Sequence, residues 1–399
     1  MTYPLQIAER DQLLAKAHSI RSIIEGDAEQ SEADRTLAMS SVDAMYDAGL
    51  LSMCAPRSLG GQEADLVTQA EVYEIISEAN GAAGWCCFIG ATAVGLLGSM
   101  AGDVAVAEVF KDGRIPRGSG SVIPSGLTEK VEGGYRVNGR WAFGSGIHHA
   151  EWVSTAAVLA VNGEPVLLPD GTPDVRMICV PINDVITEDN WHSTGLCGTG
   201  SSHYRLEDVF VSDDFVLQRD PPQRGGALFH LPLYGYVSAC HAGFALGVAK
   251  RALTEIIDLA SNKRRKFSGV ALADRGAFHK ELGVISCKLA GARAYSLDIL
   301  NQVWEGTCKE DEQVSLVTWG ECRAAMAYVT EIAAEVATFA YRYGTGVALY
   351  KPHPLQRCLR DIYTGTQHGI VSDENYEVLG RTLIGRGEWD PMIGGPPQD

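Results

Sequence analysis

The first hundred residues of the chain place apolar side chains at the spacing of an α-helix. Leu13, Leu14, Ile20 and Ile24 fall on one such stripe. Because residues three or four apart share a helix face, this pattern predicts an amphipathic helix. Residues 84–100 are apolar on most sides, which predicts a helix buried near the centre of the fold. The region is therefore predicted to be all-α.

Around Ile115 the period changes from that of a helix to that of a strand. Tyr135, Val137, Trp141 and Phe143 fall on one face of a two-residue alternation, behind a Glu-Gly-Gly turn. This pattern predicts a hairpin strand with these side chains on a common face. Glycine, proline and aspartate separate further β-like runs, at residues 152–161, 175–180 and 204–211.

Helical spacing returns after residues 221–222, with long runs at 277–303, 313–343 and 354–372. Helices of this length form a bundle. The order of helices, strands and helices, without βαβ alternation, argues against a Rossmann domain. We therefore predict an α+β fold in three parts: an N-terminal α domain (1–114), a central antiparallel β-domain (115–220) and a C-terminal helical bundle (221–399).

The composition is that of an ordinary globular protein, with 46% hydrophobic and 21% charged residues among 399. A formal net charge of -17 repels phosphate backbones and anionic membranes, so neither nucleic acid nor a membrane is an expected partner. The N-terminus lacks the basic and apolar regions of a secretory signal. Ten cysteines form no CxxC pair, which favours reduced thiols in a cytoplasmic protein.

Three segments resemble parts of the acyl-CoA dehydrogenase superfamily. Residues 139–146, Gly-Arg-Trp-Ala-Phe-Gly-Ser-Gly, are similar to the strand and turn that lie against the flavin ring there. Residues 195–201, Gly-Leu-Cys-Gly-Thr-Gly-Ser, with the strand at 206–211, are similar to the segments that close its β-domain. Residues 360–361, Arg-Asp, followed by His368, resemble the bundle helix that reaches the active site in the monooxygenase branch. The resemblance implies the fold of that superfamily, with a four-helix C-terminal bundle.

Within the superfamily, the chain resembles the two-component aromatic monooxygenases, a branch that includes the p-hydroxyphenylacetate hydroxylases. Common acyl-CoA dehydrogenases carry a catalytic glutamate about eight residues after the Arg-Asp pair, where this chain has Gly369 beside His368. Some acyl-CoA dehydrogenases carry that base on another helix. An acyl-CoA dehydrogenase with bound FAD therefore stays the alternative.

The resemblance implies the chemistry of a group D flavin monooxygenase. A separate NAD(P)H-flavin reductase would supply reduced FMN or FAD, since the chain has no dinucleotide fingerprint. Oxygen would add at the flavin C4a, and the C4a-hydroperoxyflavin would hydroxylate a small phenol- or indole-type substrate. A homotetramer is expected on the same ground.

Two residues are the catalytic candidates that the resemblance implies. His368 would take a proton from the substrate, because an imidazole titrates near neutral pH. Ser145, between Gly144 and Gly146, would bring its hydroxyl and nearby backbone N–H groups to the flavin N5 edge. The alternatives are a helix histidine satisfied by packing and a hairpin turn that needs glycine for its backbone. Trp85 and His368 would line the substrate pocket.

Further residues are candidates for binding the flavin. Trp141 and Phe143 would cover the ring, and Ser145 and Gly146 would approach it. The other candidates come from two later segments of the chain, and they are Thr199, Ser201, Arg264 and Phe267.

The two later segments have different predicted roles. Thr199 and Ser201 lie in a glycine loop whose N–H groups would form a nest for phosphate or the ring edge, with a bare glycine turn as the alternative. Arg264 and Phe267 resemble an Arg-x-x-Phe motif that contacts flavin phosphate across a subunit interface, with a solvated basic run as the alternative. No metal is expected, because the adjacent His148 and His149 would face opposite sides of a strand.

Overall fold

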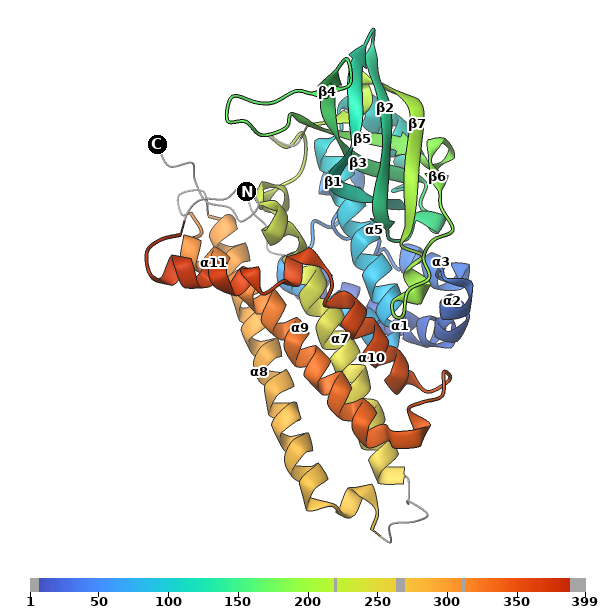
Figure 1. The fold of residues 1–399 in the computed structure, drawn as a ribbon, viewed down its shortest axis with the longest axis vertical. Helices are drawn as coiled ribbons and strands as arrows, with labels where there is room; N and C mark the ends of the chain where they lie inside the picture. The colour runs from blue at the N-terminus through green and yellow to red at the C-terminus, as the bar shows by residue number, and fades with distance from the viewer. Residues whose placement is uncertain (1–6, 219–220, 263–269, 310–312, 388–399) are drawn as a thin grey trace.

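The computed structural model describes residues 7–218, 221–262, 270–309 and 313–387. A sheet lies at one end of the molecule and long helices lie at the other, with the N-terminal helices beside their junction (Figure 1). The predicted order of helices, strands and helices is confirmed. The proposed divisions at 114/115 and 220/221 fall between α6 and β1 and between β8 and α7.

The N-terminal part of the chain is helical and includes one strongly apolar helix. Its helices are α1 (Ile7–Gly26), α2 (Ala28–Asp34), α3 (Met39–Asp47), α4 (Leu66–Ala79), α5 (Gly81–Met100) and α6 (Asp103–Val109). Among the described residues, only α5 is long and apolar enough to cross a membrane, and 83% of its most apolar window is buried inside the protein. It contacts both β1 and α7. This is the central helix that the sequence predicted.

The sheet has the order β6-β7-β2-β1-β3-β5-β8, with β4 paired to β3. Its strands are β1 (Gly118–Val131), β2 (Gly134–Gly144), β3 (Trp152–Val161), β4 (Glu164–Pro165), β5 (Val175–Pro181), β6 (Ile186–Thr187), β7 (Ser202–Ser212) and β8 (Val216–Leu217). The pairing is antiparallel as predicted, except that β1 and β3 run parallel.

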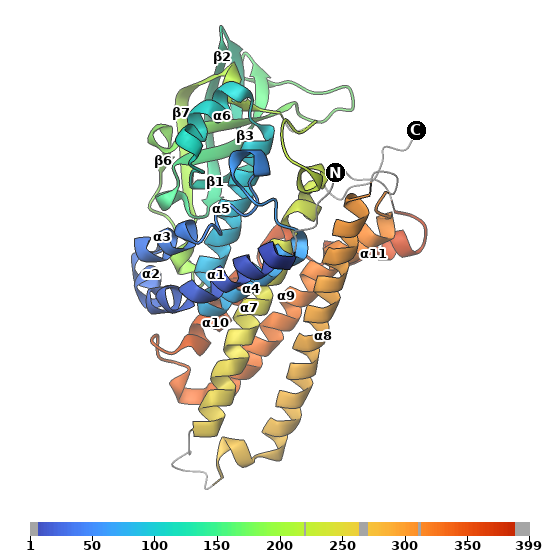
Figure 2. The same cartoon turned by 180° about the vertical axis from the view of Figure 1, so that it is seen from behind.

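The bundle consists of α7 (Leu233–Asn262), α8 (Gly276–Thr307), α9 (Leu316–Gly344), α10 (Pro354–Gly365) and α11 (Glu374–Leu383). Helix α4 lies across α7 (Figure 2). Gly243 and Gly247 allow this approach, because a Cβ at either position would lie 2.4 Å from a carbonyl oxygen of α4. The crossing fixes the turn of α7 that carries His241.

The predicted helix at 354–372 is wrong in its second half. Helix α10 ends at Gly365, and a separate short turn, Gly369–Val371, follows it. A Cβ at Gly365 would lie 2.5 Å from the Phe244 ring, so the end of α10 packs closely on α7. His368 is consequently on the connection after α10, with extended backbone, and not on a helix.

Candidate active site

A chain of three buried hydroxyl groups joins the end of β2 to the loop before β7. Ser145 Oγ lies 2.7 Å from Ser201 Oγ, which lies 2.6 Å from Thr199 Oγ1. Trp85 of α5 donates its Nε1–H to Ser145 Oγ at 3.2 Å. The structure thus brings four of the predicted site residues into one hydrogen-bonded network, from three distant parts of the sequence.

The three hydroxyl groups of this network all donate in the same direction. Thr199 Oγ1 lies 2.8 Å from the carbonyl oxygen of Leu196, which only accepts, so the Thr199 hydroxyl is the donor there. Ser201 must then donate to Thr199, and Ser145 must donate to Ser201. Among the described residues, Trp85 is the donor to Ser145 Oγ. Ser145 therefore keeps one lone pair and no hydrogen for a ligand.

The backbone N–H groups around Ser145 are already engaged. The N–H of Ser145 donates to Phe143 O at 2.8 Å, and that of Gly146 donates to Thr199 O at 2.9 Å. Phe143 and Gly146 both have positive φ, 64° and 74°, which lets the chain turn sharply here. The expectation that this turn offers free N–H groups to the flavin is therefore corrected for Ser145 and Gly146. The group left to face a ligand is the Ser145 hydroxyl.

The glycine loop at 195–201 is also tied internally rather than forming an open nest. The N–H groups of Thr199 and Gly200 donate to carbonyl oxygens within the loop, at 3.1 and 3.3 Å. The N–H of Leu196 donates to the Asp361 carboxylate at 2.6 Å. These three N–H groups are not free for a phosphate, so they do not support the predicted nest at Thr199 and Ser201. Their role in this structure is the hydroxyl chain.

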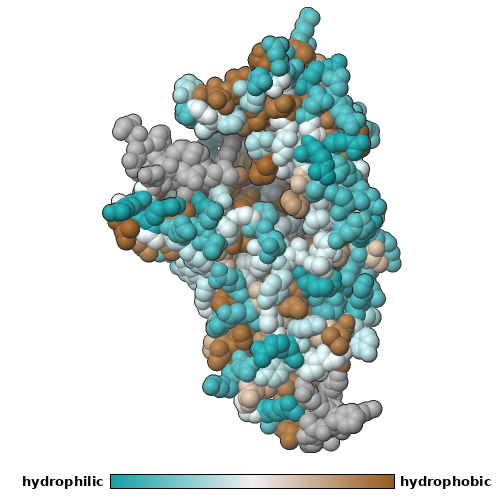
Figure 3. Space-filling view, viewed as in Figure 1, coloured by the Kyte–Doolittle hydropathy of each residue, from teal (hydrophilic) through white to brown (hydrophobic). Residues whose placement is uncertain are grey.

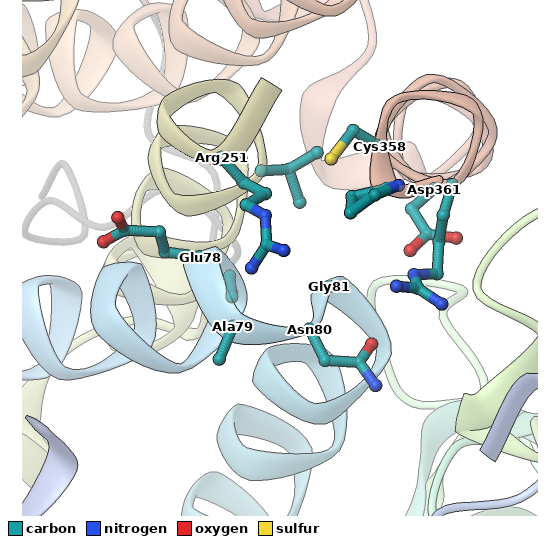
Figure 4. Close-up of a pocket in the computed structure, with 11 residues that line it drawn as sticks. Glu78, Ala79, Asn80, Gly81, Arg251, Cys358 and Asp361 are labelled. Carbon is teal, nitrogen blue, oxygen red and sulfur yellow. The ribbon is translucent and has the colours of Figure 1, made fainter. Parts of the chain in front are cut away.

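Asp361 anchors this loop from α10. Its carboxyl group is buried, and burial raises its pKa to about 6. It lines a small pocket with Asn80 and Gly81 at the α4–α5 junction and with Arg251 of α7 (Figure 4). The neighbouring Arg360 donates to Thr194 O at 2.6 Å. The Arg-Asp pair thus holds the loop in place instead of touching the hydroxyl chain.

Four rings lie around Trp85 and form with it a cluster of five, here called the aromatic cage. Trp85 lies 4.8 Å from Phe88, 5.1 Å from Phe244, 5.3 Å from His241 and 5.7 Å from His368, measured between ring centroids. His241 and His368 lie 4.7 Å apart. Trp85 and His368, both predicted to line the substrate pocket, therefore lie side by side, and Trp85 connects them to Ser145 through its hydrogen bond.

His368 is half-buried and caps the turn that follows it. The N–H of Ile370 donates to His368 Nδ1 at 3.3 Å. Because an N–H can only donate, Nδ1 is the acceptor, and the neutral ring carries its hydrogen on Nε2. Burial lowers the pKa of His368 below its ordinary value, which favours this neutral form. His368 thus offers a hydrogen-bond donor to the cage.

His241 is a site residue that the sequence reasoning missed. It is buried on α7, and its Nδ1 has no hydrogen-bond partner among the described residues. Burial, together with His368, lowers its pKa well below the ordinary value. A lone histidine in an apolar helical stretch gives no signal of its own, because its importance depends on which helices meet there.

The two aromatic residues of β2 have opposite environments. Trp141 is fully buried, donates to Ala156 O at 2.7 Å and stacks on Tyr204 at 5.6 Å. It belongs to the core of the sheet, so the structure does not support its predicted place over a flavin ring. Phe143 is 64% exposed and meets Trp191 and His203 edge-on. Its ring is available to a planar ligand.

Two of the predicted flavin-binding residues cannot be placed in the fold. Arg264 and Phe267 lie outside the described residues. Within the described ranges, no group of three or more His, Cys, Asp or Glu side chains is arranged to hold a metal ion.

One family model and one solved structure describe what this chain is similar to. Residues 239–373 match the family described as "Acyl-CoA dehydrogenase, C-terminal domain". The chain superposes on the structure of XiaF from Streptomyces sp., solved with FADH2 and glycerol, with a TM-score of 0.85 and 22% identity over 98% of each chain. The acyl-CoA dehydrogenase-like fold predicted from the motifs is confirmed.

The sequence relatives identify the branch. The indole-3-acetate monooxygenase of Pseudomonas putida is 28% identical over 88% of each chain. The FADH(2)-dependent resorcinol hydroxylase, oxygenase component, of Rhizobium sp. is 29% identical over 64% of this chain and 63% of its own. The predicted resemblance to the two-component branch is confirmed by these relatives.

Proposed function

We propose that this chain is an oxygenase component that hydroxylates a small phenol- or indole-type substrate with reduced FMN or FAD and O2. A separate NAD(P)H-dependent flavin reductase would supply the reduced flavin. When bound, the flavin supplies the electrons that activate O2 for transfer to the ring. The observation that carries the proposal is Ser145, which sits beside the aromatic cage and is fixed as a hydrogen-bond acceptor.

The direction of the hydroxyl chain suits the reduced form of the cofactor. Reduced flavin carries a hydrogen on N5, whereas the N5 of oxidised flavin is a bare acceptor. Ser145 Oγ has a lone pair to offer and its hydrogen is committed to Ser201. An N5–H placed at Ser145 would therefore find an acceptor, whereas an oxidised N5 there would face a second acceptor. Phe143, exposed beside this turn, is the residue that we propose for contact with the ring.

The aromatic cage is suited to a small planar substrate. Phe88, Phe244 and Trp85 are buried and supply apolar walls. Such walls exclude water from the reacting atoms, which protects a reactive oxygen species from wasteful breakdown. His368 brings a hydrogen-bond donor into the same space. We retain it as the residue that contacts the substrate, as a donor in its resting form rather than as the base first expected.

A homotetramer and a cytoplasmic location are further parts of the proposal. Support for self-association comes from exposed apolar side chains on β1, β3 and β5 and on the loop between β4 and β5, and Figure 3 shows apolar surface at the sheet end of the molecule. These residues are Val122, Ile123, Leu127, Val131, Val161, Leu167, Leu168 and Val175. Large exposed apolar surfaces mark protein–protein contacts. Arg264 and Phe267 stay candidates for flavin-phosphate contact across such an interface.

One experiment tests the proposed function directly. The purified protein is combined with a flavin reductase, NADH, O2 and a panel of phenols and indoles, and products are identified by mass spectrometry with ¹⁸O2. We expect one labelled oxygen in the product and consumption of O2 that depends on the reductase. Failure across the panel, together with bleaching of bound FAD by an acyl-CoA, would overturn the proposal in favour of an acyl-CoA dehydrogenase.

A further inference from the structure

His241 has an unused hydrogen-bonding atom in the middle of the aromatic cage. It is 2% exposed, and rings of Trp85, Phe88 and His368 surround it at centroid distances of 5.3, 5.9 and 4.7 Å. Within the described residues, His241 Nδ1 is buried without a partner. The indole N–H of Trp85 does not fill this need, because it donates to Ser145. Buried polar atoms are normally paired, so an orphan beside a binding site marks the place of a ligand atom.

The neighbouring His368 supplies the complementary group. Its Nδ1 accepts from the Ile370 N–H, so its hydrogen is on Nε2. The cage therefore contains one imidazole that donates and one whose buried Nδ1 has no partner among the described residues, with ring centroids 4.7 Å apart. A single atom that both donates and accepts would satisfy the two rings together. Among the groups on small aromatic rings, a hydroxyl has this property, and an indole N–H only donates.

We propose that His241 and His368 together bind a hydroxyl group of the substrate, with His241 Nδ1 accepting its hydrogen and His368 Nε2–H donating to its oxygen. The inference rests on the proposed function and narrows it: the substrate class is a phenol in its neutral form. His241 is on this view a residue that determines specificity by direct contact with the substrate.

The neutral state of the two imidazoles also favours a neutral phenol as the substrate. Burial keeps both imidazoles neutral, because it lowers the pKa of each. A phenolate would accept from His368 but place its negative charge against the lone pair of His241. A phenyl methyl ether would bring no hydrogen to His241 and leave its nitrogen unpaired. The phenolate and the ether should therefore both bind more weakly than the neutral phenol, because an unsatisfied buried group is costly.

The test compares the binding of phenol, its methyl ether anisole and indole to the protein loaded with reduced flavin, by anaerobic isothermal titration calorimetry. We expect phenol to bind roughly 10-fold or more tightly than anisole, with indole between them, because one buried hydrogen bond distinguishes each step. Equal affinity for phenol and anisole in the wild-type protein would overturn the inference.

Two variants assign the effect to His241. His241→Phe keeps an aromatic ring but removes the acceptor, so the preference for phenol over anisole should fall to about 2-fold or less. His241→Asn keeps an oxygen near the position of Nδ1 and should retain most of the preference. The dissociation constant of reduced flavin should be unchanged in both, which checks their folding. A preference that survives in His241→Phe, or is lost equally in both variants, would contradict the assigned contact.

The outcomes also separate this inference from the proposed function. If labelled hydroxylated product forms but phenol and anisole bind alike, the hydroxylase function stands and the histidine pair is wrong. If no aromatic ligand binds and an acyl-CoA bleaches bound FAD, the proposed function itself fails.

Discussion

Replacing Thr199 by valine should weaken the preference of the protein for reduced over oxidised flavin. Thr199 ends the hydroxyl chain, because its donation to Leu196 O obliges Ser201 and then Ser145 to donate in sequence. Valine has nearly the same shape and no hydroxyl. The Ser201 hydrogen would be released and could turn to Ser145, which in turn frees Ser145 to donate to an oxidised N5.

The expected size of the effect follows from the burial of the chain. A net neutral hydrogen bond stabilises by about 0.5–1.5 kcal/mol, and a buried group left without its partner costs about 1–3 kcal/mol. The difference in binding free energy between reduced flavin, whose N5–H matches Ser145, and oxidised flavin, whose N5 lone pair does not, should therefore fall by about 1–2 kcal/mol. This corresponds to a change of roughly 5- to 30-fold in the ratio of the two dissociation constants. Leu196 O is not orphaned, since Trp191 Nε1 also donates to it at 3.0 Å.

The measurement is titration of each redox form of the flavin into the protein, anaerobically for the reduced form. Thr199→Ser is the matched control, because it keeps the hydroxyl and loses only a methyl group, and its ratio should stay near that of the wild type. A ratio that is the same in wild type, Thr199→Val and Thr199→Ser would refute the argument that the chain sets the donor direction at Ser145.

Three further variants test other parts of the site. Ser145→Ala should weaken binding of reduced flavin about 3- to 10-fold and raise hydrogen peroxide release over product in a coupled assay, and unchanged values would exclude the contact. Trp141→Phe should lower the free energy of unfolding by about 1–3 kcal/mol in urea, since Ala156 O loses its buried donor, while flavin affinity stays constant. Asp361 has a raised folded-state pKa of about 6, so its contribution to stability is present below about pH 4 and lost as pH rises through 6. Asp361→Asn, which keeps an oxygen for Leu196 N–H, should therefore gain up to about 3 kcal/mol relative to wild type between about pH 4 and 7, and parallel stability curves would contradict this.

The sequence pattern predicted elements well where an apolar run is bounded by turn residues. The strand expected at 152–161 is β3, Trp152–Val161, a short apolar run in which residues 153–157 are all buried. The helix expected at 354–372 was too long. Helical spacing of apolar residues continues past Gly365, although the helix itself ends there. At this point Gly365 packs closely on Phe244 of α7, a neighbour that local sequence does not reveal.

The site was predictable only where a motif carried it. The motif around Ser145 located the turn but not the direction in which its neighbours face. Alternation along β2 predicted Trp141 and Phe143 on one face, whereas Trp141 is buried and Phe143 is 64% exposed. The left-handed φ of Phe143 and a register shift between β2 and β7 at this end of the strand rotate Phe143 outward. His241 belongs to no motif, so its role emerged only from the crossing of α7 with the helices around it.

The short stretch from Arg360 to His368 connects the two halves of the site. At its start, Arg360 and Asp361 hold the backbone at Thr194 and Leu196, and the Leu196 carbonyl is the acceptor that orients the hydroxyl chain. At its end, His368 is fixed as a donor by the turn that it caps. A displacement of α10 would therefore alter both the acceptor character of Ser145 and the position of the substrate-facing imidazole. For this reason, substitutions in α10 that touch neither flavin nor substrate should change flavin discrimination and phenol affinity together.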